Sequence, residues 1–276
     1  LYAPPSFLCP APASCCRRSE RCCTDFSMGK SARIAIVGDV HDYWSLEEDT
    51  RALRFLKPDL VLFTGDFGNE NVDLIASVSN LYFPKAVILG NHDAWSTNVF
   101  SSDGKDPVQM QLKILGDDHV GYRRMDFPSF NLSIVGGRPF SHGGSHMFKW
   151  RLLLARYGVG DMDASSQRIF EAAIGAPDDH SLVFLAHNGP TGLGSNRDDI
   201  CGRDWIYCGG DHGDPDLAKA ISELRKTTQR IKLVVFGHMH KGLACGGGFR
   251  KMVVVGDDGI VYLNGAVVPR VKPFGN

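Results

Sequence analysis

The stretch Arg33-Ile34-Ala35-Ile36-Val37-Gly38-Asp39-Val40-His41 passes from an apolar run directly to a carboxylate and an imidazole. The run Arg33–Val37 is short, rich in β-branched residues and closed by a glycine, which is typical of a buried strand. Asp39 and His41 are two residues apart on the loop that follows, so both side chains can point into one cavity. A single Asp-x-His pair is weak support for a metal site, and its meaning depends on the rest of the chain.

The same arrangement, an apolar run followed by polar ligands, recurs four more times. The further runs are Leu60–Thr64, Lys85–Leu89, Leu182–Ala186 and Leu233–Phe236. The segments at their ends read Gly65-Asp66, Gly90-Asn91-His92-Asp93, Ala186-His187-Asn188 and Gly237-His238-Met239-His240. Because open α/β sheets place their chemistry beyond the carboxyl ends of the strands, we expect these side chains to converge on one rim. Carboxylate, imidazole and amide ligands together suit Mn²⁺, Fe²⁺ or Zn²⁺.

The segments between these runs alternate with them as helices, which predicts βαβ units with parallel strands. The predicted helices are Leu46–Lys57, Glu70–Asn80, Pro107–Leu115, Phe148–Tyr157, Ser165–Ile174 and a helix from Pro215 to about Thr228. A further strand is predicted over Leu132–Val135. A hairpin is predicted from Lys251–Val255 to Ile260–Leu263 across Gly256-Asp257-Asp258-Gly259. The segment Gly189–Gly213 is too long for a simple turn, so we expect it to be a functional loop.

The composition is that of an ordinary globular protein of 276 residues, with 43% hydrophobic and 22% charged residues. The net charge of −1 gives no general attraction for nucleic acid, so we expect no extended nucleic-acid binding. No apolar run has the length of about 20 residues that spans a bilayer, and we expect no membrane association. The eight cysteines form neither a regular disulfide framework nor paired Cys-x-x-Cys motifs, which favours unpaired thiols in a reducing compartment.

The first thirty residues differ from the rest of the chain. Leu1–Lys30 is poor in acidic residues and rich in proline, serine and basic residues. This composition resembles an organellar transit peptide, and a chloroplast one fits it best. We therefore expect residues 1–30 to be a disordered leader of a plastid protein and residues 31–276 to form one domain. If translation starts at Met28, the expected location is the cytoplasm.

The ligand-bearing segments, taken together and in this order, resemble the signature of the calcineurin-like metallophosphoesterase superfamily. That signature is Asp-x-His, Gly-Asp, Gly-Asn-His-Asp/Glu, His and Gly-His-x-His, and the likeness covers roughly residues 33–270. It implies an α/β fold, a four-layer αββα sandwich of two mixed sheets flanked by helices. It also implies a dinuclear metal site at the carboxyl ends of the strands.

The resemblance assigns a ligand set to each of two divalent ions, which would be Mn, Fe or Zn. Asp39, His41 and His240 would hold one ion, Asn91, His187 and His238 would hold the other, and Asp66 would bridge both. Such a pair activates a bridging hydroxide and neutralises the phosphoryl oxygens. His92 would lie outside the metal shell and protonate the leaving group as general acid, so His92 and Asp66 are the predicted catalytic residues.

Departures from the protein Ser/Thr phosphatases of the superfamily narrow the expected substrate. That branch carries Gly-Asp-x-Val-Asp-Arg-Gly, whereas this chain reads Gly65-Asp66-Phe67-Gly68-Asn69-Glu70. Asn69 stands where that branch has the acid that orients its catalytic histidine, and the following arginine is absent. The chain is more similar to phosphodiesterase-like members of cyanobacteria and plants, so we expect a small phosphomonoester or phosphodiester as substrate. A phosphoprotein phosphatase and an inactive scaffold with the same fold are the alternatives.

Four residues are predicted to contact the substrate: Asn91, Arg138, His212 and Asn264. Arg138 follows a strand, and the sequence allows either a phosphate contact or a surface salt bridge. Asn264 belongs to an ending similar to the Asn-x-Gly…Pro-Arg of diesterase-type members, although an asparagine beside a glycine is equally typical of a turn. The other histidines are expected to be ordinary polar positions: His119, His142, His146 and His180. The sequence indicates no oligomeric state.

Overall fold

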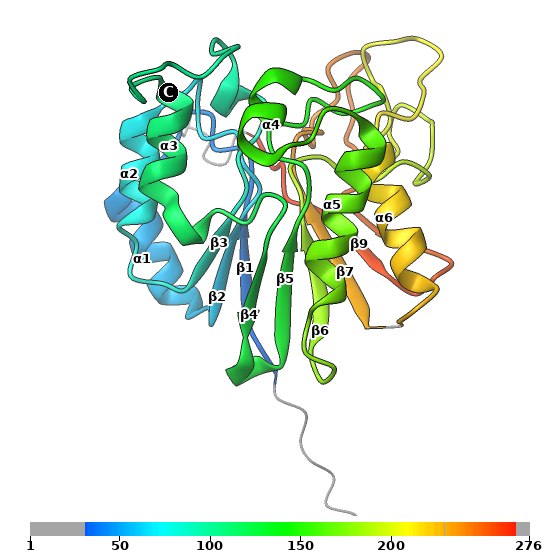
Figure 1. Ribbon diagram of the computed structural model, residues 1–276. Helices are drawn as coiled ribbons and strands as arrows, with labels where there is room; N and C mark the ends of the chain where they lie inside the picture. The colour runs from blue at the N-terminus through cyan, green and yellow to red at the C-terminus, as the bar shows by residue number, and fades with distance from the viewer. Residues whose placement is uncertain (1–30, 229, 269–276) are drawn as a thin grey trace, which may run out of the picture.

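The computed structural model describes residues 31–228 and 230–268. The predicted leader Leu1–Lys30 therefore lies outside the described residues, as does the end of the predicted domain. Within the described part, two β-sheets pack against each other and carry helices on their outer faces (Figure 1).

The smaller sheet contains three parallel strands in the order β1-β2-β3. Its strands are β1 (Ile34–Val37), β2 (Leu60–Phe63) and β3 (Lys85–Val87), and its helices are α1 (Leu46–Leu56), α2 (Val72–Ser79) and α3 (Pro107–Leu115). These bounds agree with the predicted βαβαβ segment to within one or two residues at each end. Because β1, β2 and β3 run the same way, the loops that carry Asp39, Asp66 and Asn91 leave the sheet at one edge.

The larger sheet contains six strands in the order β4-β5-β6-β7-β9-β8. They are β4 (Arg124–Phe127), β5 (Leu132–Gly136), β6 (Ser181–Leu185), β7 (Ile231–Phe236), β8 (Val253–Val255) and β9 (Val261–Asn264). The four central strands are parallel, and the edge strands β4 and β8 are antiparallel to their neighbours. The predicted hairpin is confirmed, since β8 pairs with β9. The helices of this half are α4 (Trp150–Tyr157), α5 (Met162–Ile174) and α6 (Pro215–Arg225).

Alternate residues of the strands form two separate apolar layers. One layer lies between the sheets and contains Leu60 and Leu62 of β2, Ile134 of β5 and Leu185 of β6. The residues between them, such as Val61 and Phe63, pack with the helices instead. Strands buried on both faces read as continuous apolar runs, as those in the sequence do. The predicted αββα sandwich is thus confirmed, with a wholly parallel small sheet and a mixed large one.

Local capping explains where the helices begin. Asp106 accepts a hydrogen bond from the backbone N–H of Gln109, and Pro107 occupies the first turn of α3, which begins and ends as predicted. The prediction that the helix over Ser165–Ile174 begins at Ser165 is wrong. Asp161 caps α5 by accepting from the N–H of Ala164, so the helix begins at Met162.

The sequence missed β4 because its four residues, Arg124–Phe127, include two charged side chains. Such charges are ordinary on an edge strand, where one face of the strand meets water. Arg124 pairs with Asp126 there at 2.8 Å. Within the described ranges, no helix is long and apolar enough to cross a membrane. Three of the eight cysteines lie within the described residues, and these are free thiols: Cys201, Cys208 and Cys245.

Candidate metal centre

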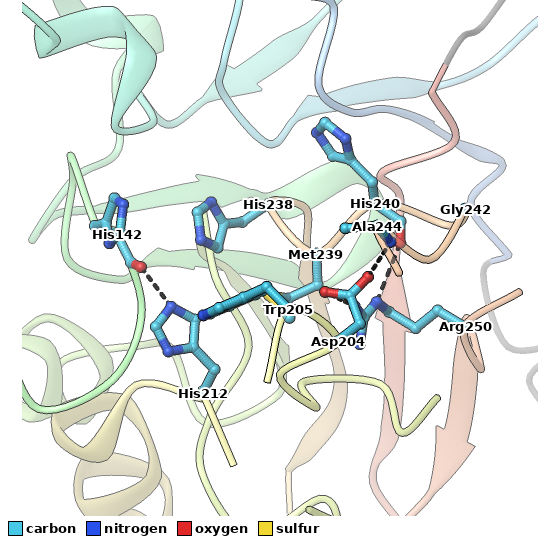
Figure 2. A pocket seen from close by; sticks show the side chains of 10 residues that line it. All are labelled: His142, Asp204, Trp205, His212, His238, Met239, His240, Gly242, Ala244 and Arg250. Carbon is cyan, nitrogen blue, oxygen red and sulfur yellow. Dashed lines mark hydrogen bonds and ion pairs between the residues drawn. The ribbon is translucent and has the colours of Figure 1, made fainter. Parts of the chain in front are cut away.

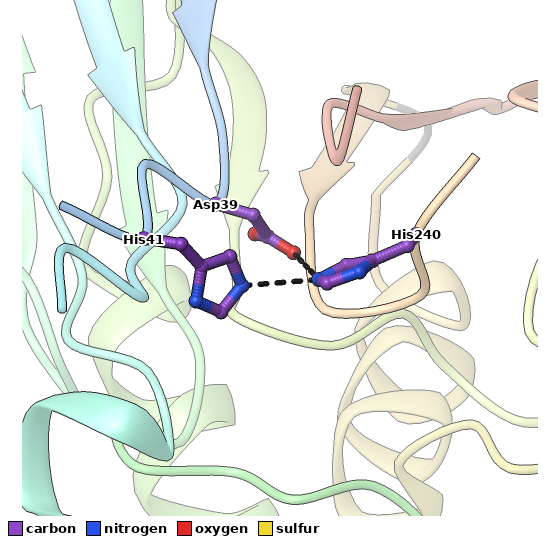
Figure 3. Close-up of side chains that lie close together, drawn as sticks. All are labelled: Asp39, His41 and His240. Carbon is purple, nitrogen blue, oxygen red and sulfur yellow. Dashed lines mark hydrogen bonds and ion pairs between the residues drawn. The ribbon is translucent and has the colours of Figure 1, made fainter. Parts of the chain in front are cut away.

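The polar side chains that follow the strands converge on one site. His238 and His240 project from the loop after β7 (Figure 2). His240 Nε2 lies 3.0 Å from Nε2 of His41, which belongs to the loop after β1 in the other sheet (Figure 3). The site therefore spans the junction of the two sheets, as the strand ends predicted.

The first group of ligands consists of Asp39, His41 and His240. Their ligand atoms all lie within 4.8 Å of one another, and Asp39 Oδ2 is 3.5 Å from His240 Nε2. Asp39 Oδ1 accepts from the backbone N–H of His238 at 3.1 Å. Asp39 Oδ2 is buried without a hydrogen-bond partner, and a buried carboxylate oxygen in that state favours a cation as its partner.

The second group consists of Asp66, His187 and His238, again within 4.8 Å of one another. His187 Nδ1 donates to the carbonyl oxygen of Thr64 at 2.7 Å, which leaves Nε2 free to bind a metal. Asn91 Oδ1 lies 2.9 Å from that same Nε2. The amide oxygen of Asn91 therefore lies where it could join the second set, which is the role that the resemblance implies.

Asp66 lies between the two groups. Its Oδ2 is 3.8 Å from His41 Nε2 in the first group. Its Oδ1 is 3.4 Å from His187 Nε2 in the second. One carboxylate that presents a different oxygen to each group is the arrangement that bridges two cations, so the donor set fits a pair of divalent ions.

Burial and charge in this site favour bound cations. Burial, and then the nearby Asp66, raise the pKa of Asp39 to about 7. Burial alone would lower the pKa of His187, but the carboxylates of Asp66 and Asp39 raise it to about 10. The site therefore attracts positive charge, and a metal ion supplies the charge that a proton would otherwise supply. Burial and the neighbouring His41 lower the pKa of His240 to about 4, which keeps that imidazole in the neutral form that binds metals.

The backbone is strained at four of the predicted ligands. Asp39, His41, Asp66 and His238 have φ angles of 47°, 45°, 55° and 65°, in the left-handed region that non-glycine residues rarely adopt. Each such residue costs on the order of 1–3 kcal/mol, and such strain gathers at functional sites. Because the ligand atoms of these four residues lie within the two groups described above, we interpret the strain as part of the ligand geometry.

Asp93 holds two of the ligand loops together. Its carboxylate accepts from the backbone N–H groups of Asp66, Phe67 and Gly90 at 2.9, 2.9 and 2.7 Å. Gly90 has no room for a side chain, because a Cβ there would lie 2.3 Å from Asp66 Oδ1. The fourth residue of the Gly90-Asn91-His92-Asp93 segment thus positions the bridging ligand without facing the metal site itself.

His92 lies beside the ligands in an orientation fixed by two neighbours. Its Nδ1 is 2.6 Å from Asn69 Oδ1, so Nδ1 donates and Nε2 is free. Its ring stacks on Trp95, with centroids 4.7 Å apart and planes 11° apart. A ring nitrogen of His92 also lies within 4.8 Å of ligand atoms of His41 and Asp66. The predicted general acid is therefore next to the metal centre.

The structure corrects the prediction for Arg138. Its side chain is 1% exposed, and it donates to Asp216 and Asp214 at 2.9 Å each. It forms a buried ion pair, so neither a surface salt bridge nor contact with a substrate phosphate describes it. Its partners come from the start of α6, which the pair fixes to the end of β5.

The other predicted substrate contacts have different surroundings. Asn264 is 2% exposed, donates to the carbonyl oxygen of Met239 and accepts from the N–H of Ala266. Asn264 therefore holds the loop that carries His238 and His240 through the carbonyl oxygen of Met239, and its buried side chain is not open to a substrate. His212 lies next to the site, with its ring 6.0 Å from that of His238.

A cavity of about 430 Å³ lies beside the metal centre, and sequence reasoning missed most of the residues around it (Figure 2). Its lining residues are His142, Asp204, Trp205, His212, His238, Met239, His240, Gly242, Ala244 and Arg250. The expectation that His142 is an ordinary polar position is wrong in this respect, because its ring lies 5.7 Å from that of His238. The useful signal was the long Gly189–Gly213 loop, which supplies Asp204, Trp205 and His212.

Comparisons with known proteins gave one family match and several similar solved structures. A family model described as calcineurin-like phosphoesterase matches residues 32–242. Among solved structures, a dimetal phosphatase from Danio rerio is 13% identical with a TM-score of 0.48, and the match covers 84% of this chain and 86% of that one. Phosphopantetheinyl hydrolase from Mycobacterium tuberculosis is also 13% identical with a TM-score of 0.48, covering 86% of this chain and 89% of that one. The search of curated proteins gave no match.

Proposed function

Because this chain belongs to the calcineurin-like phosphoesterase family, it is a metal-dependent hydrolase of phosphoric esters, and we propose that its substrate is a small phosphomonoester or phosphodiester. The observation that supports this most directly is Asp66, whose two carboxylate oxygens face two different groups of ligands. That placement fits a pair of ions rather than one. A pair of bound ions supplies an activated water and neutralises charge on the phosphoryl group.

In this proposal the two groups of side chains have separate tasks. Asp39, His41 and His240 hold one cation, and Asn91, His187 and His238 hold the other. Asp66 fixes the separation between them. The N–H of His92 donates to Asp66 Oδ1 at 2.9 Å, which keeps the bridging carboxylate aligned. The phosphoryl group of the substrate would bind where both groups are open to solvent, since His41, His238 and His240 are each partly exposed.

His92 acts as general acid in this proposal. The hydrogen bond from Nδ1 to Asn69 leaves Nε2 free, so the doubly protonated ring presents its second proton, on Nε2, to the leaving oxygen. An alkoxide is a poor leaving group, and protonation by a positioned imidazole contributes about 10²–10⁴-fold to such reactions. Stacking on Trp95 holds the plane of the ring for this transfer.

The experiment that tests the proposal is a hydrolysis panel with purified chain loaded with Mn²⁺, Fe²⁺ or Zn²⁺. The substrates are alkyl phosphomonoesters, phosphodiesters, nucleotides and phosphopeptides. We expect turnover of small esters that a chelator abolishes. Asp66→Asn should lower kcat by about 10³-fold or more because it weakens both ion sites, and His92→Ala should lower it by about 10²-fold.

Asp117→Asn is the matched control for the loss of a carboxylate, because the Asp117 side chain is 96% exposed. We expect it to leave turnover unchanged. Hydrolysis confined to phosphopeptides would instead assign the chain to the phosphoprotein phosphatases. A metal-loaded chain that hydrolyses none of the substrates would fit the inactive scaffold and contradict the proposal.

A further inference from the structure

The cavity beside the metal centre restricts what the substrate carries besides its phosphoryl group. Its volume of about 430 Å³ is within the range of pockets that hold small organic molecules. His238 and His240 line the cavity and are also predicted metal ligands. An organic group esterified to a phosphoryl group at the metal centre would therefore extend into this space.

The charged side chains that line the cavity neutralise each other. Asp204 and Arg250, each 4% exposed, pair at 3.4 Å. Arg250 Nη1 donates to the carbonyl oxygens of Asp199 and Gly202 at 2.7 Å each, and Asp204 Oδ2 accepts from the N–H of Ala244 at 2.5 Å. Among the described residues that line the cavity, there is no other Asp, Glu, Lys or Arg. No Asp, Glu, Lys or Arg side chain that lines the cavity is therefore left unpaired for an ionic group of a ligand.

Trp205 supplies an aromatic wall to the cavity. Its side chain is 48% exposed, and its ring contacts that of His212 in a T-shaped pair with centroids 4.8 Å apart. His212 is fixed in turn, since its Nε2 donates to the carbonyl oxygen of His142 at 2.8 Å (Figure 2). The indole therefore has a fixed neighbour on one side and remains open for contact with a ligand.

We propose that this cavity binds an uncharged, planar aromatic group of the substrate, with Trp205 as its stacking surface. The assignment rests on the proposed function, because it takes the phosphoryl group to be held by the metal centre. A charged group would lose part of its hydration here without gaining an unpaired carboxylate, ammonium or guanidinium group as its partner. A small aliphatic group would leave the indole exposed to water, whereas an aromatic ring covers it and gains the energy of an aromatic pair.

Phosphonates test this assignment by binding, because their carbon–phosphorus bond is not hydrolysed. We would titrate the Mn²⁺-loaded full chain with benzylphosphonate, propylphosphonate and 4-carboxybenzylphosphonate in a calorimeter. Benzylphosphonate should bind about tenfold more tightly than propylphosphonate, a gain of the size that aromatic stacking gives. The added carboxylate should remove most of that gain.

Substitutions of two tryptophans with similar exposure test whether Trp205 causes the preference for the aromatic phosphonate. Trp205→Ala should bring the ratio of the two dissociation constants close to one, and Trp205→Phe should keep most of the preference. Trp150→Ala removes a tryptophan that is 47% exposed and lines a different cavity, so it should leave the ratio unchanged. Binding of propylphosphonate by Trp150→Ala, unaltered from the parent chain, serves as the check that the loss of a partly exposed tryptophan does not by itself disturb the metal centre.

The possible failures are distinct. Equal affinity of the parent chain for benzylphosphonate and propylphosphonate, or equal effects of Trp205→Ala and Trp150→Ala, would overturn the cavity assignment and leave the phosphoesterase activity standing. If no phosphonate binds and no ester is hydrolysed, the proposed function fails and the cavity assignment fails with it.

Discussion

Asn69 contacts His92, so the residue type at position 69 affects the charge that the His92 ring can carry. A carboxylate there would stabilise a positive charge on His92, whereas the amide oxygen of Asn69 fixes the ring without adding a full negative charge. The 2.6 Å contact shows that orientation of His92 is kept. The motif places Asn69 where the protein phosphatases have an acid, and in the structure its side chain reaches His92.

Removal of the hydrogen bond between Asn69 and His92 should slow protonation of the leaving group more than it weakens substrate binding. Asn69→Ala leaves His92 in place but frees its ring to rotate, so we expect kcat for an alkyl phosphate ester to fall about tenfold, with little change in KM. For a 4-nitrophenyl ester, whose leaving group needs little protonation, the loss should be smaller.

Asn69→Asp is the conservative comparison, since it keeps an acceptor oxygen at the same place. Steady-state kinetics with both esters checks the prediction. Equal losses with the alkyl and the nitrophenyl ester in Asn69→Ala would show that Asn69 supports the fold of the site rather than the acid.

The burial of Arg138 could not be predicted from the residues around it in the sequence. It follows β5 at the rim where phosphate-binding residues are expected, and nothing near it in the chain indicates burial. Its partners, Asp214 and Asp216, are more than seventy positions further along. A buried ion pair made across that separation depends on how α6 packs against the sheet, which local pattern does not contain.

At the scale of elements, hydrogen bonds connect the loops that carry the predicted metal ligands to one another. Asp93 connects the loop after β3 with the loop after β2, and His238 N–H connects the loop after β7 with Asp39 after β1. Substitution of Asp93 should therefore disturb several ligands at once, although Asp93 is expected to bind no metal itself.

Asp93→Asn replaces one acceptor oxygen by an amide donor that faces the backbone N–H groups of Asp66, Phe67 or Gly90. A buried donor opposed to another donor costs about 1–3 kcal/mol. We expect the free energy of unfolding, measured by urea titration in the presence of a chelator, to fall by about 2 kcal/mol.

The surface variant Asp117→Asn should change that free energy by less than about 0.5 kcal/mol. If Asp93→Asn also changes the free energy of unfolding by less than about 0.5 kcal/mol relative to the parent chain, the three hydrogen bonds do not stabilise the loops.

The elements themselves were predictable wherever a local rule determined them. Pro107 after Asp106 sets the start of α3, and the continuous apolar runs of β2 and β6 identify buried strands. The errors occurred where two signals competed. Asp161 caps α5 one turn before Ser165, and Arg124 with Asp126 disguises β4 as a loop.

At the scale of the whole molecule, the metal centre exists because two sheets meet with their strand ends at the same rim. The sequence predicted the convergence of the seven predicted ligands, since each follows a strand and parallel strands end together. It did not predict the cavity beside them. Trp205 and His212 lie on a loop with no regular structure, and His142 lies in the segment between β5 and α4, so only the folded chain brings them to His238.

The most direct test of the whole account is the position of the metal ions. A crystal of the full chain grown with Mn²⁺ and measured at the manganese absorption edge would show them as anomalous peaks. We expect two peaks about 3.5–4 Å apart, with Asp66 between them, Asp39, His41 and His240 around one, and Asn91, His187 and His238 around the other. A single peak, or peaks that Asp66 does not join, would contradict the dinuclear centre on which the proposed hydrolysis depends.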